Sequence, residues 1–424
     1  MTRNLPVDAD RLWADVMALA EITDPARPYT RRSFSPLFLQ GRDWLRMQFE
    51  AAGLTTRIDA AGNLIGRRDG ANPSLGVIAI GSHSDTVPSG GRFDGIAGVV
   101  AGLEIARALR DRDVMLQHSL EVIDFLAEEP SEYGLSCVGS RGMAGLLKPH
   151  LALASPDGEG LGDALMRVGG DPARLADAVR SDLAAFLELH IEQGPVLEQR
   201  GIDVGIVTSI AGIRRIEIVF DGAADHAGTT PMDMRRDALV AGARTAALAC
   251  DVAETLARGE AFFVATVGVF EIAPNAANVV PGRCRLIIDI RTGDVALTEQ
   301  FVATVERESA AFAHEARVER TSFKTLSDGA PVQCDAGLQT ALRESARNLG
   351  LSAIDLASGA GHDAAFVSRL CPAAMVFIPC REGKSHAPEE WAERDALAAG
   401  AAVMFEALTA LDARLAQAAE AGAI

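Results

Sequence analysis

An apolar run, LGVIAIGSH at residues 75–83, constrains the fold of this chain more than any other segment. A strand that is apolar on both faces belongs in the interior of a parallel sheet, where helices cover both sides. The next segment, 94–113, carries apolar residues at helical spacing, and two more strand candidates occupy 119–127 and 183–190. Strands that alternate with helices predict an α/β fold with a mostly parallel sheet.

The middle of the chain has a different order of elements. The sequence predicts a strand at 213–220, a helix at 237–257, strands at 260–272 and 283–290, a helix at 296–316 and a strand at 317–324. This β-α-β-β-α-β order is that of ferredoxin-like α+β domains. We therefore expect a separate α+β domain at 212–327.

The α/β pattern resumes after this segment, with a helix at 336–349, a strand at 374–379 and a long helix at 389–418. A chain of 424 residues is also too long for one ordinary hydrophobic core. We therefore expect residues 1–211 and 328–424 to form one α/β domain, into which the α+β domain is inserted.

Composition limits the partners of this protein. The formal net charge is −18 and no basic patch is present, so nucleic-acid binding is not expected. The six cysteines are scattered without a CxxC pair, which favours a reducing compartment. Residues 1–22 resemble an amphipathic helix rather than a signal peptide, and no apolar run reaches the roughly 20 residues that span a bilayer. We predict a cytoplasmic protein without a membrane partner.

The segment GSHSDTVPSGGRFDG (81–95) carries the first candidate metal ligands. His83 follows directly after the apolar strand, where an open α/β sheet places its functional groups. Asp85 is placed to accept a hydrogen bond from the second imidazole nitrogen and so to fix the tautomer of His83. Asp94 stands at the start of a helix, where it is either a metal ligand or an ordinary N-cap.

Two adjacent carboxylates, Glu128 and Glu129, follow the next apolar strand in FLAEEPSEYG (125–134). Like charges side by side are costly unless a cation neutralises them or one stays protonated. One carboxylate would then bind metal, and the other would transfer protons beside a metal-bound water. The alternative, on this segment alone, is a solvated acidic turn.

Further histidines stand in the same kind of position. His190 ends an apolar strand, and His386 lies in the polar loop after a later strand. A mixture of imidazoles and carboxylates with one shared aspartate suits Zn²⁺, Mn²⁺ or Co²⁺ rather than Ca²⁺. His226, on a Gly/Thr loop of the insertion, is either a substrate contact or a simple loop residue. His362, at a Gly-rich helix start, is either part of an anion site or a cap.

With the segments HIEQGPVLE, HAGTTPM, PNAANVVPG, SGAGHDA and SHAPEEW, these motifs resemble the signatures of the M20 metallopeptidase-like superfamily. Within it they are most similar to the amidase, hydantoinase/carbamoylase family. That family includes N-carbamoyl-L-amino-acid hydrolases, allantoate amidohydrolases and one class of β-ureidopropionase. The similarity runs from about residue 10 to residue 412, and its motifs are specific for the family rather than for one member.

The resemblance implies two divalent ions per subunit, with Zn²⁺, Mn²⁺, Co²⁺ or Ni²⁺ as candidates. Their ligands would be His83 and His190 for one ion, Glu129 and His386 for the other, and Asp94 as a bridge between them. Glu128 would be the general base and then the general acid, with Asp85 behind His83.

The resemblance also implies a homodimer through the inserted domain, which would act as a lid. The implied substrate contacts are Gln193, His226, Asn278, Arg291 and the backbone of Gly359 and Ala360. Arg291 suits a substrate carboxylate because its fork binds two oxygens at once. Without the resemblance, Arg291 would be interpreted as an ordinary charge at a strand end.

Three positions depart from the family pattern. The stretch Pro130–Tyr133 replaces a Gly-Ser-Arg-Phe type sequence, which removes a basic residue beside the predicted metals. Ser209 replaces a glycine before the inserted domain, and Lys384 replaces an aliphatic residue before SHAPEE. None is a predicted ligand, so these departures concern the choice of substrate.

The implied reaction is hydrolysis of the linear C–N bond of an N-carbamoyl (ureido) substrate that bears a carboxylate. For an N-carbamoyl-L-amino acid the products would be the amino acid, ammonia and CO₂. Glu128 would take a proton from the attacking water, while His226 and the metals would stabilise the oxyanion. The alternatives are an allantoate amidohydrolase, an aminopeptidase or aminoacylase of the superfamily, and a catalytically silent binding protein, which the complete ligand set disfavours.

Overall fold

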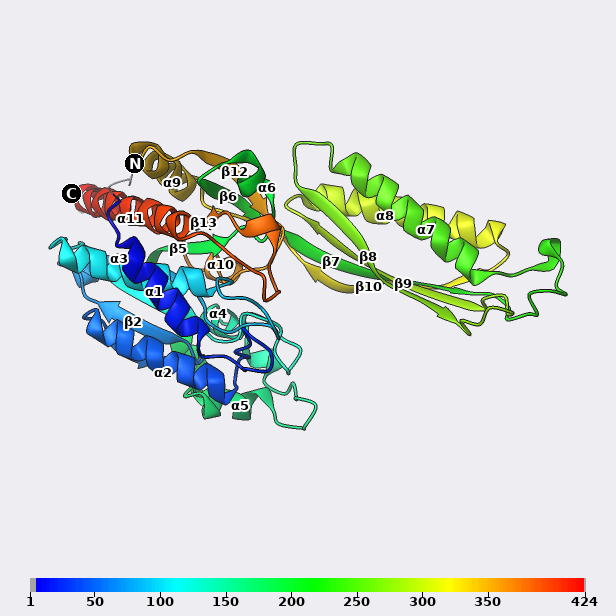
Figure 1. Cartoon of the computed structure of the whole chain (residues 1–424), viewed down its shortest axis with the longest axis horizontal. Coiled ribbons are helices and arrows are strands. Elements are labelled where there is room, and N and C mark those ends of the chain that lie inside the picture. Colours follow the sequence, from blue (N-terminus) through cyan, green and yellow to red (C-terminus); the bar gives the residue numbers. More distant parts are fainter. Residues whose placement is uncertain (1–4, 423–424) are drawn as a thin grey trace. The chain divides into compact units, whose positions relative to one another are not determined.

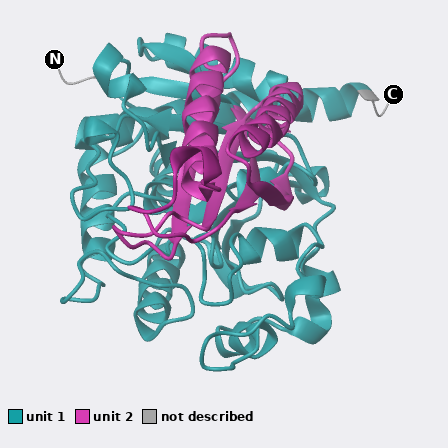
Figure 2. Cartoon of the chain, turned by 90° about the vertical axis from the view of Figure 1, so that its right-hand side faces the viewer, with its two compact units in different colours: residues 1–208, 334–356, 361–424 teal, residues 209–333, 357–360 magenta. Residues whose placement is uncertain are grey.

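The chain forms two compact units in the computed structural model, which describes residues 5–422. The first unit comprises Met1–Thr208, Cys334–Leu356 and Gly361–Ile424, and the second comprises Ser209–Gln333 and Ala357–Ala360 (Figure 2). The sequence did not predict that Ala357–Ala360 belongs to the second unit, because so short a segment has no periodicity of its own. Residues 1–4 of the predicted N-terminal helix lie outside the described residues.

A nine-stranded sheet crosses the first unit (Figure 1). Its strands are β1 (Thr55–Ile58), β2 (Leu64–Arg68), β3 (Val77–His83), β4 (Ser119–Phe125), β5 (Leu183–Ile191), β6 (Val204–Ile210), β11 (Val332–Gln333), β12 (Ala353–Ser358) and β13 (Ala373–Ile378). Their order is β1-β2-β4-β3-β5-β13-β6-β11, with β12 paired to β6. The last residues of β6 and β12, and all of β11, belong to the second unit.

The four central strands of this sheet run parallel. β4, β3, β5 and β13 pair in parallel, whereas the pairs on either side of them that involve β1, β2, β6 and β11 are antiparallel. The expected mostly parallel sheet is therefore a mixed sheet. Crossovers with helices join the parallel strands, whereas a short turn joins β1 to β2 and permits only antiparallel pairing. The carboxyl ends of the four central strands meet at one edge.

Helices cover the sheet. They are α1 (Ala9–Ala20), α2 (Pro36–Ala51), α3 (Ile96–Asp111), α4 (Val138–Met143), α5 (Leu161–Arg167), α6 (Val196–Arg200), α9 (Ala336–Asn348), α10 (Ala364–Val367) and α11 (Arg394–Gly422). α3 packs on β3, β4 and β5, α11 packs on β5 and β13, and α1 lies against both helices. α11 is long and apolar enough to cross a bilayer, yet 72% of its most apolar window is buried within the protein, as in a core helix.

The second unit is a four-stranded antiparallel sheet with two helices. Its elements are β7 (Gly212–Asp221), α7 (Ala238–Leu256), β8 (Phe263–Ala273), β9 (Arg283–Thr292), α8 (Val295–Glu315) and β10 (Glu319–Gly329), and the strand order is β10-β7-β9-β8. Alternate residues of β9 are buried, as expected for a strand with one covered face. Leu286, Ile288 and Ile290 join Phe220 and Phe301 in the core beneath α7 and α8.

Candidate metal centre

His83 is the last residue of β3, and its ring is buried. Its Nδ1 lies 3.1 Å from the backbone oxygen of Asp85, so we assign the proton to this nitrogen. The Asp85 carboxylate, the expected partner, lies farther away, at 3.5 Å. It accepts hydrogen bonds from the backbone N–H groups of Glu128 and Glu129 instead, at 3.2 and 3.3 Å. Asp85 therefore ties the loop after β4 to the loop after β3.

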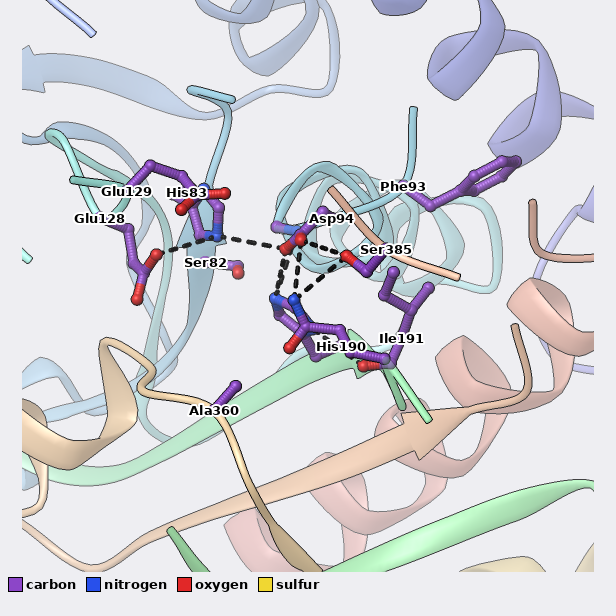
Figure 3. Close-up of polar contacts among 12 residues, drawn as sticks. Ser82, His83, Phe93, Asp94, Glu128, Glu129, His190, Ile191, Ala360 and Ser385 are labelled. Carbon is purple, nitrogen blue, oxygen red and sulfur yellow. Dashed lines mark hydrogen bonds and ion pairs between the residues drawn. The ribbon is translucent and has the colours of Figure 1, made fainter. Parts of the chain in front are cut away.

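Asp94 lies just before α3, yet its side chain does not cap this helix. Its Oδ1 lies 3.1 Å from Nε2 of His190 and 3.8 Å from Nε2 of His83 (Figure 3). Its Oδ2 lies 3.1 Å from Nε2 of His386. The alternative of an ordinary N-cap is therefore wrong, because the buried carboxylate turns toward three histidines.

The remaining predicted ligands come from the loops after β4 and β13. Glu129 is buried, and its Oε1 lies 3.1 Å from Nε2 of His386. The side chain of His386 is 48% exposed. Its backbone has a positive φ of 55°, which is uncommon for a residue other than glycine and aims its ring at Asp94 and Glu129. The structure thus brings all five predicted ligands to one edge of the sheet.

The predicted ligands form two groups whose ligand atoms lie within 4.8 Å of one another. One group is His83, Asp94 and His190, and the other is Asp94, Glu129 and His386. This arrangement, with one carboxylate common to both groups, fits a pair of divalent cations that share Asp94.

The environment of His190 and His83 also fits a metal. In His190, Nδ1 lies 3.0 Å from the backbone oxygen of Ile191, and Nε2 accepts a hydrogen bond from the N–H of Gly95 at 3.2 Å. In the neutral ring this pattern places the proton on Nδ1, so Nε2, which faces Asp94, is the nitrogen that would bind a metal. Gly95 also keeps the front of His83 open, because a Cβ at this position would lie 2.3 Å from Nε2 of His83.

The pKa values of the ionisable side chains in the centre are strongly shifted by their neighbours. Although burial opposes protonation, Glu128 and the nearby aspartates raise the pKa of His83 well above its usual value. Burial likewise opposes ionisation of Asp94, but His190 and His386 hold the pKa of Asp94 well below its usual range. Asp94 and Glu129 raise the pKa of His386 to about 10. Without a metal, protons on the imidazoles therefore supply the positive charge that balances the carboxylates.

Glu128 follows β4 and is buried beside His83. Its Oε2 lies 3.6 Å from Nε2 of His83, and its Oε1 accepts a hydrogen bond from Sγ of Cys137 at 3.3 Å. Burial raises the pKa of Glu128 well above its usual value against the opposing charge of His83, and Glu129 adds to the rise. Such a carboxylate takes up a proton readily, as a general base must. The sequence did not predict the contact of Cys137 with Glu128, because Cys137 belongs to none of the motifs that carry the candidate ligands.

Ser385, Gln193 and Glu390 complete the surroundings of Asp94. Oδ2 of Asp94 accepts hydrogen bonds from Oγ of Ser385 at 2.7 Å and from Nε2 of Gln193 at 2.8 Å. Oε1 of Gln193 is buried without a hydrogen-bond partner among residues 5–422. Glu390 accepts hydrogen bonds from the backbone N–H groups of Phe93 and Asp94. The sequence did not predict this role, because Glu390 was only one of two acids in SHAPEEW.

His362 forms part of the wall behind His190. The two rings meet edge-on with their centroids 4.6 Å apart, and Phe377 lies 5.9 Å from His362 on another side. The helix-cap alternative for His362 is wrong, because Asp363 occupies the N-cap position of α10. Glu188 could join His190 and His362 in a further metal-sized group. Its oxygens, however, accept hydrogen bonds from a serine hydroxyl and from the first amide of α10.

The other predicted substrate contacts all lie in the second unit. His226 and Asn278 are exposed on adjacent loops, which a hydrogen bond from the N–H of Ala227 to the Asn278 oxygen joins at 2.9 Å. Nδ1 of His226 accepts the N–H of Gly228, which places the ring proton on Nε2.

Arg291 lies beside the segment of the second unit that contains Gly359 and Ala360. Its Nη1 donates to the backbone oxygen of Gly359 at 2.9 Å, and its Nε donates to Asp289 at 2.7 Å. The structure therefore brings Arg291 and Gly359 together within this unit. Arg291 is also the penultimate residue of β9, so its position agrees with the alternative of an ordinary charge at a strand end.

The three departures from the family pattern have separate surroundings. Tyr133 is buried against Phe34, and its hydroxyl donates to Glu159 at 2.5 Å. Lys384 is exposed and pairs with Glu382 at 2.5 Å. Ser209 is buried against Gly293, where a Cβ would lie 2.6 Å from its Oγ.

These features define a class of protein: a mixed α/β protein of two units, with carboxylates and histidines grouped for divalent metals. Residues 79–410 match the profile of peptidase family M20/M25/M40, so the chain belongs to this family. It is a hydrolase of carbon–nitrogen bonds, as its curated relatives are.

Several relatives match nearly the whole chain. An N-carbamoyl-L-amino acid amidohydrolase of Geobacillus stearothermophilus is 38% identical over 404 residues, which cover 94% of this chain and 97% of that protein. A ureidoglycolate hydrolase of Arabidopsis thaliana is 34% identical over 423 residues, which cover 97% of this chain and 88% of that protein. A crystal structure of an amidase of the hydantoinase/carbamoylase family from Burkholderia multivorans has a TM-score of 0.88 at 36% identity, and the match covers 95% of this chain and 98% of that one.

Proposed function

We propose that this protein is a metal-dependent amidohydrolase that cleaves the linear C–N bond of an N-carbamoyl-L-amino acid. The products would be the amino acid, ammonia and CO₂. The observation that carries the proposal is the position of the Asp94 carboxylate, which lies 3.1 Å from both His190 and His386. Similarity to N-carbamoyl-L-amino acid amidohydrolases supports the substrate class.

The five ligand candidates would hold two divalent ions. His83 and His190 would hold one, Glu129 and His386 the other, and Asp94 would contact both. Zn²⁺, Mn²⁺, Co²⁺ and Ni²⁺ all suit this mixture of nitrogen and oxygen donors. When bound, such ions lower the pKa of water and stabilise negative charge on a carbonyl oxygen.

Glu128 would move the protons of the reaction. As a buried carboxylate with a raised pKa, it would take a proton from the attacking water and later give it to the leaving nitrogen. Asp85 would fix the positions of His83 and of Glu128. Its backbone oxygen contacts the His83 ring, and its carboxylate accepts hydrogen bonds from the N–H groups of Glu128 and Glu129.

We assign the substrate contacts to residues of both units. Gln193, with its unpartnered Oε1, would accept a ureido N–H, and His226 would donate Nε2–H to the developing oxyanion. Arg291 and Asn278 would bind the substrate carboxylate, and the backbone of Gly359 and Ala360 would contribute further hydrogen bonds. We also propose that the second unit is a ferredoxin-like lid and the dimer interface, and that the protein is cytoplasmic, as its free cysteines favour.

A substrate panel tests this function. The protein, reconstituted separately with Zn²⁺, Mn²⁺, Co²⁺ and Ni²⁺, would be assayed for ammonia release from N-carbamoyl-L-amino acids, allantoate and ureidoglycolate, and for cleavage of dipeptides and N-acyl amino acids. We expect turnover with N-carbamoyl-L-amino acids. Faster turnover of allantoate would favour the allantoate amidohydrolase alternative, and cleavage of dipeptides an aminopeptidase. Metal binding without turnover of any substrate would favour a binding protein.

A further inference from the structure

Glu390 is a buried carboxyl group outside the proposed ligand set, and it shapes the Asp94 loop. Its side chain is fully buried, and its Oε1 accepts the N–H groups of Phe93 at 2.7 Å and of Asp94 at 3.1 Å. Gly91 leaves the room for this group, since a Cβ there would lie 2.3 Å from the Glu390 carboxyl. The backbone around Asp94 is therefore wrapped around one carboxyl from the opposite end of the chain.

Ser385 links the other oxygen of Glu390 to Asp94. Its Oγ lies 3.0 Å from Oε2 of Glu390 and 2.7 Å from Oδ2 of Asp94, and Nε2 of Gln193 donates to it at 3.2 Å. A hydroxyl has one proton and two acceptor positions. It can therefore donate to only one of the two carboxyl groups that it contacts.

The direction of this chain follows from the other partners of Asp94. Asp94 faces His190 and His386, so it is the group that needs to be an anion. Ser385 then donates to Asp94 and accepts from Gln193. Glu390 thus holds the backbone of the Asp94 loop through Oε1, and its Oε2 lies within hydrogen-bond distance of Ser385.

We propose that Glu390 and Ser385 are positioning residues for Asp94: Glu390 holds the backbone of the Asp94 loop, and Ser385 forms a hydrogen bond with the metal-facing carboxylate. This inference rests on the metal site of the proposed function and adds the residues that hold its shared ligand in one orientation. Groups behind a metal ligand typically change metal affinity or activity by about 10–100-fold when they are removed.

Titration of the metal-free protein with Co²⁺, followed by visible absorption, tests this role without any substrate. We expect Glu390→Ala and Ser385→Ala to weaken the binding of at least one Co²⁺ by about 10–100-fold. Glu390→Gln should recover most of that loss, because its amide nitrogen donates to Ser385 and its oxygen accepts the two backbone N–H groups. Glu389→Ala is the matched control, since Glu389 is the exposed neighbour in the same motif.

Thermal unfolding of each metal-free variant checks that it folds. If Glu390→Ala does not fold, Ser385→Ala still tests the same chain, because it removes a single hydroxyl from a partly exposed residue. Wild-type affinity in Ser385→Ala would overturn the inference. So would a loss in Glu390→Gln equal to that in a folded Glu390→Ala, since the amide oxygen of Gln can still accept the two backbone N–H groups. Absence of Co²⁺ binding in the wild-type protein would instead overturn the proposed metal site itself, and the inference with it.

Discussion

Glu128 and Glu129 are neighbours in the chain but have opposite surroundings. Glu129 contacts the imidazole of His386, whereas Glu128 is buried beside a thiol and has a raised pKa. Asp85 holds the backbone of both and so fixes which side chain faces which partner. Two identical side chains thereby have different surroundings, which suit the proposed roles of Glu129 as a ligand and Glu128 as a proton carrier.

Glu128→Gln separates these two roles. The amide has the same shape but accepts no proton, so we expect turnover to fall by at least about 100-fold, within the range typical of general acid–base groups. Metal content, measured by atomic emission, should remain at the wild-type value. Glu132→Gln is the control, because Glu132 is an exposed acid in the same loop. Activity of Glu128→Gln within a few-fold of wild type would refute the assignment of the base.

Gly95 has a backbone conformation that favours glycine, and it also leaves room beside the proposed metal ligand His83. Its φ is +68°, and a Cβ would lie 2.3 Å from Nε2 of His83. Gly134 has a similar φ of +71° but no neighbour within 4 Å of its would-be Cβ. Alanine at either position should cost about 1–2 kcal/mol of stability through the left-handed backbone. Only Gly95→Ala should also lose metal binding, which calorimetric titration would detect, and equal metal affinities would contradict this account.

Metal uptake by the metal-free protein should release protons. His386 has a pKa of about 10 there, so it is protonated at pH 7.5, whereas a metal binds only the neutral imidazole. The part of the release that comes from His386 should persist below pH 10 and disappear above it. Calorimetry in buffers of different ionisation enthalpy measures the number of protons, and His386→Asn should release fewer. Binding heats that do not depend on the buffer would contradict the protonated state of His386.

At the scale of elements, hydrophobic patterning predicted the strands that support the centre. The runs at 75–83, 119–127, 183–190 and 374–379 are present as β3, β4, β5 and β13. The pattern did not predict β6 or β12, because β6 contains a glycine and two hydroxyl residues, and β12 contains an acid and has only one buried residue. It also could not predict the antiparallel flanks of the sheet, since strand direction depends on connections rather than on burial.

The candidate site divides in the same way. Residues placed directly after apolar strands were predictable, because the carboxyl ends of parallel strands meet at one edge. Glu390 and Cys137 were not, because their roles depend on contacts with backbone N–H groups and with Glu128 that leave no trace in a local pattern. The true partner of the Asp85 carboxylate was missed for the same reason.

Helix α7 of the second unit depends on its N-cap. The Asp237 side chain accepts hydrogen bonds from the N–H groups of Leu239 and Val240. Asp237→Ala should therefore destabilise the second unit by about 1 kcal/mol. Hydrogen exchange of the α7 amides measures this change, and Asp251→Ala, farther along the same helix, is the control. Equal protection in the two variants would show that the cap contributes nothing.

At the scale of the molecule, the proposed metal ligands and all aromatic fluorophores lie in the first unit. The tryptophans are Trp13, Trp44 and Trp391, and the tyrosines are Tyr29 and Tyr133. Tryptophan fluorescence therefore reports unfolding of the first unit, while circular dichroism at 222 nm detects the helices of both.

Removal of metal should thus change the tryptophan fluorescence transition more than the circular dichroism transition. A ligand at 100 times its dissociation constant stabilises the state that binds it by about 2.7 kcal/mol. We expect a chelator to lower the midpoint of the fluorescence transition and to leave a separate part of the dichroism transition unchanged. The same shift in both signals would mean that the two units unfold as one.

The second unit leaves and rejoins the first through neighbouring strand ends. Ser209 and Ile210 of β6 pair antiparallel with Gln333 and Val332 of β11. Opposed residues in such a ladder have Cα atoms about 4.5–5.5 Å apart, a gap that a two-residue hairpin turn closes. A gene could therefore gain, exchange or lose the whole insert at this junction without redirecting the flanking chain.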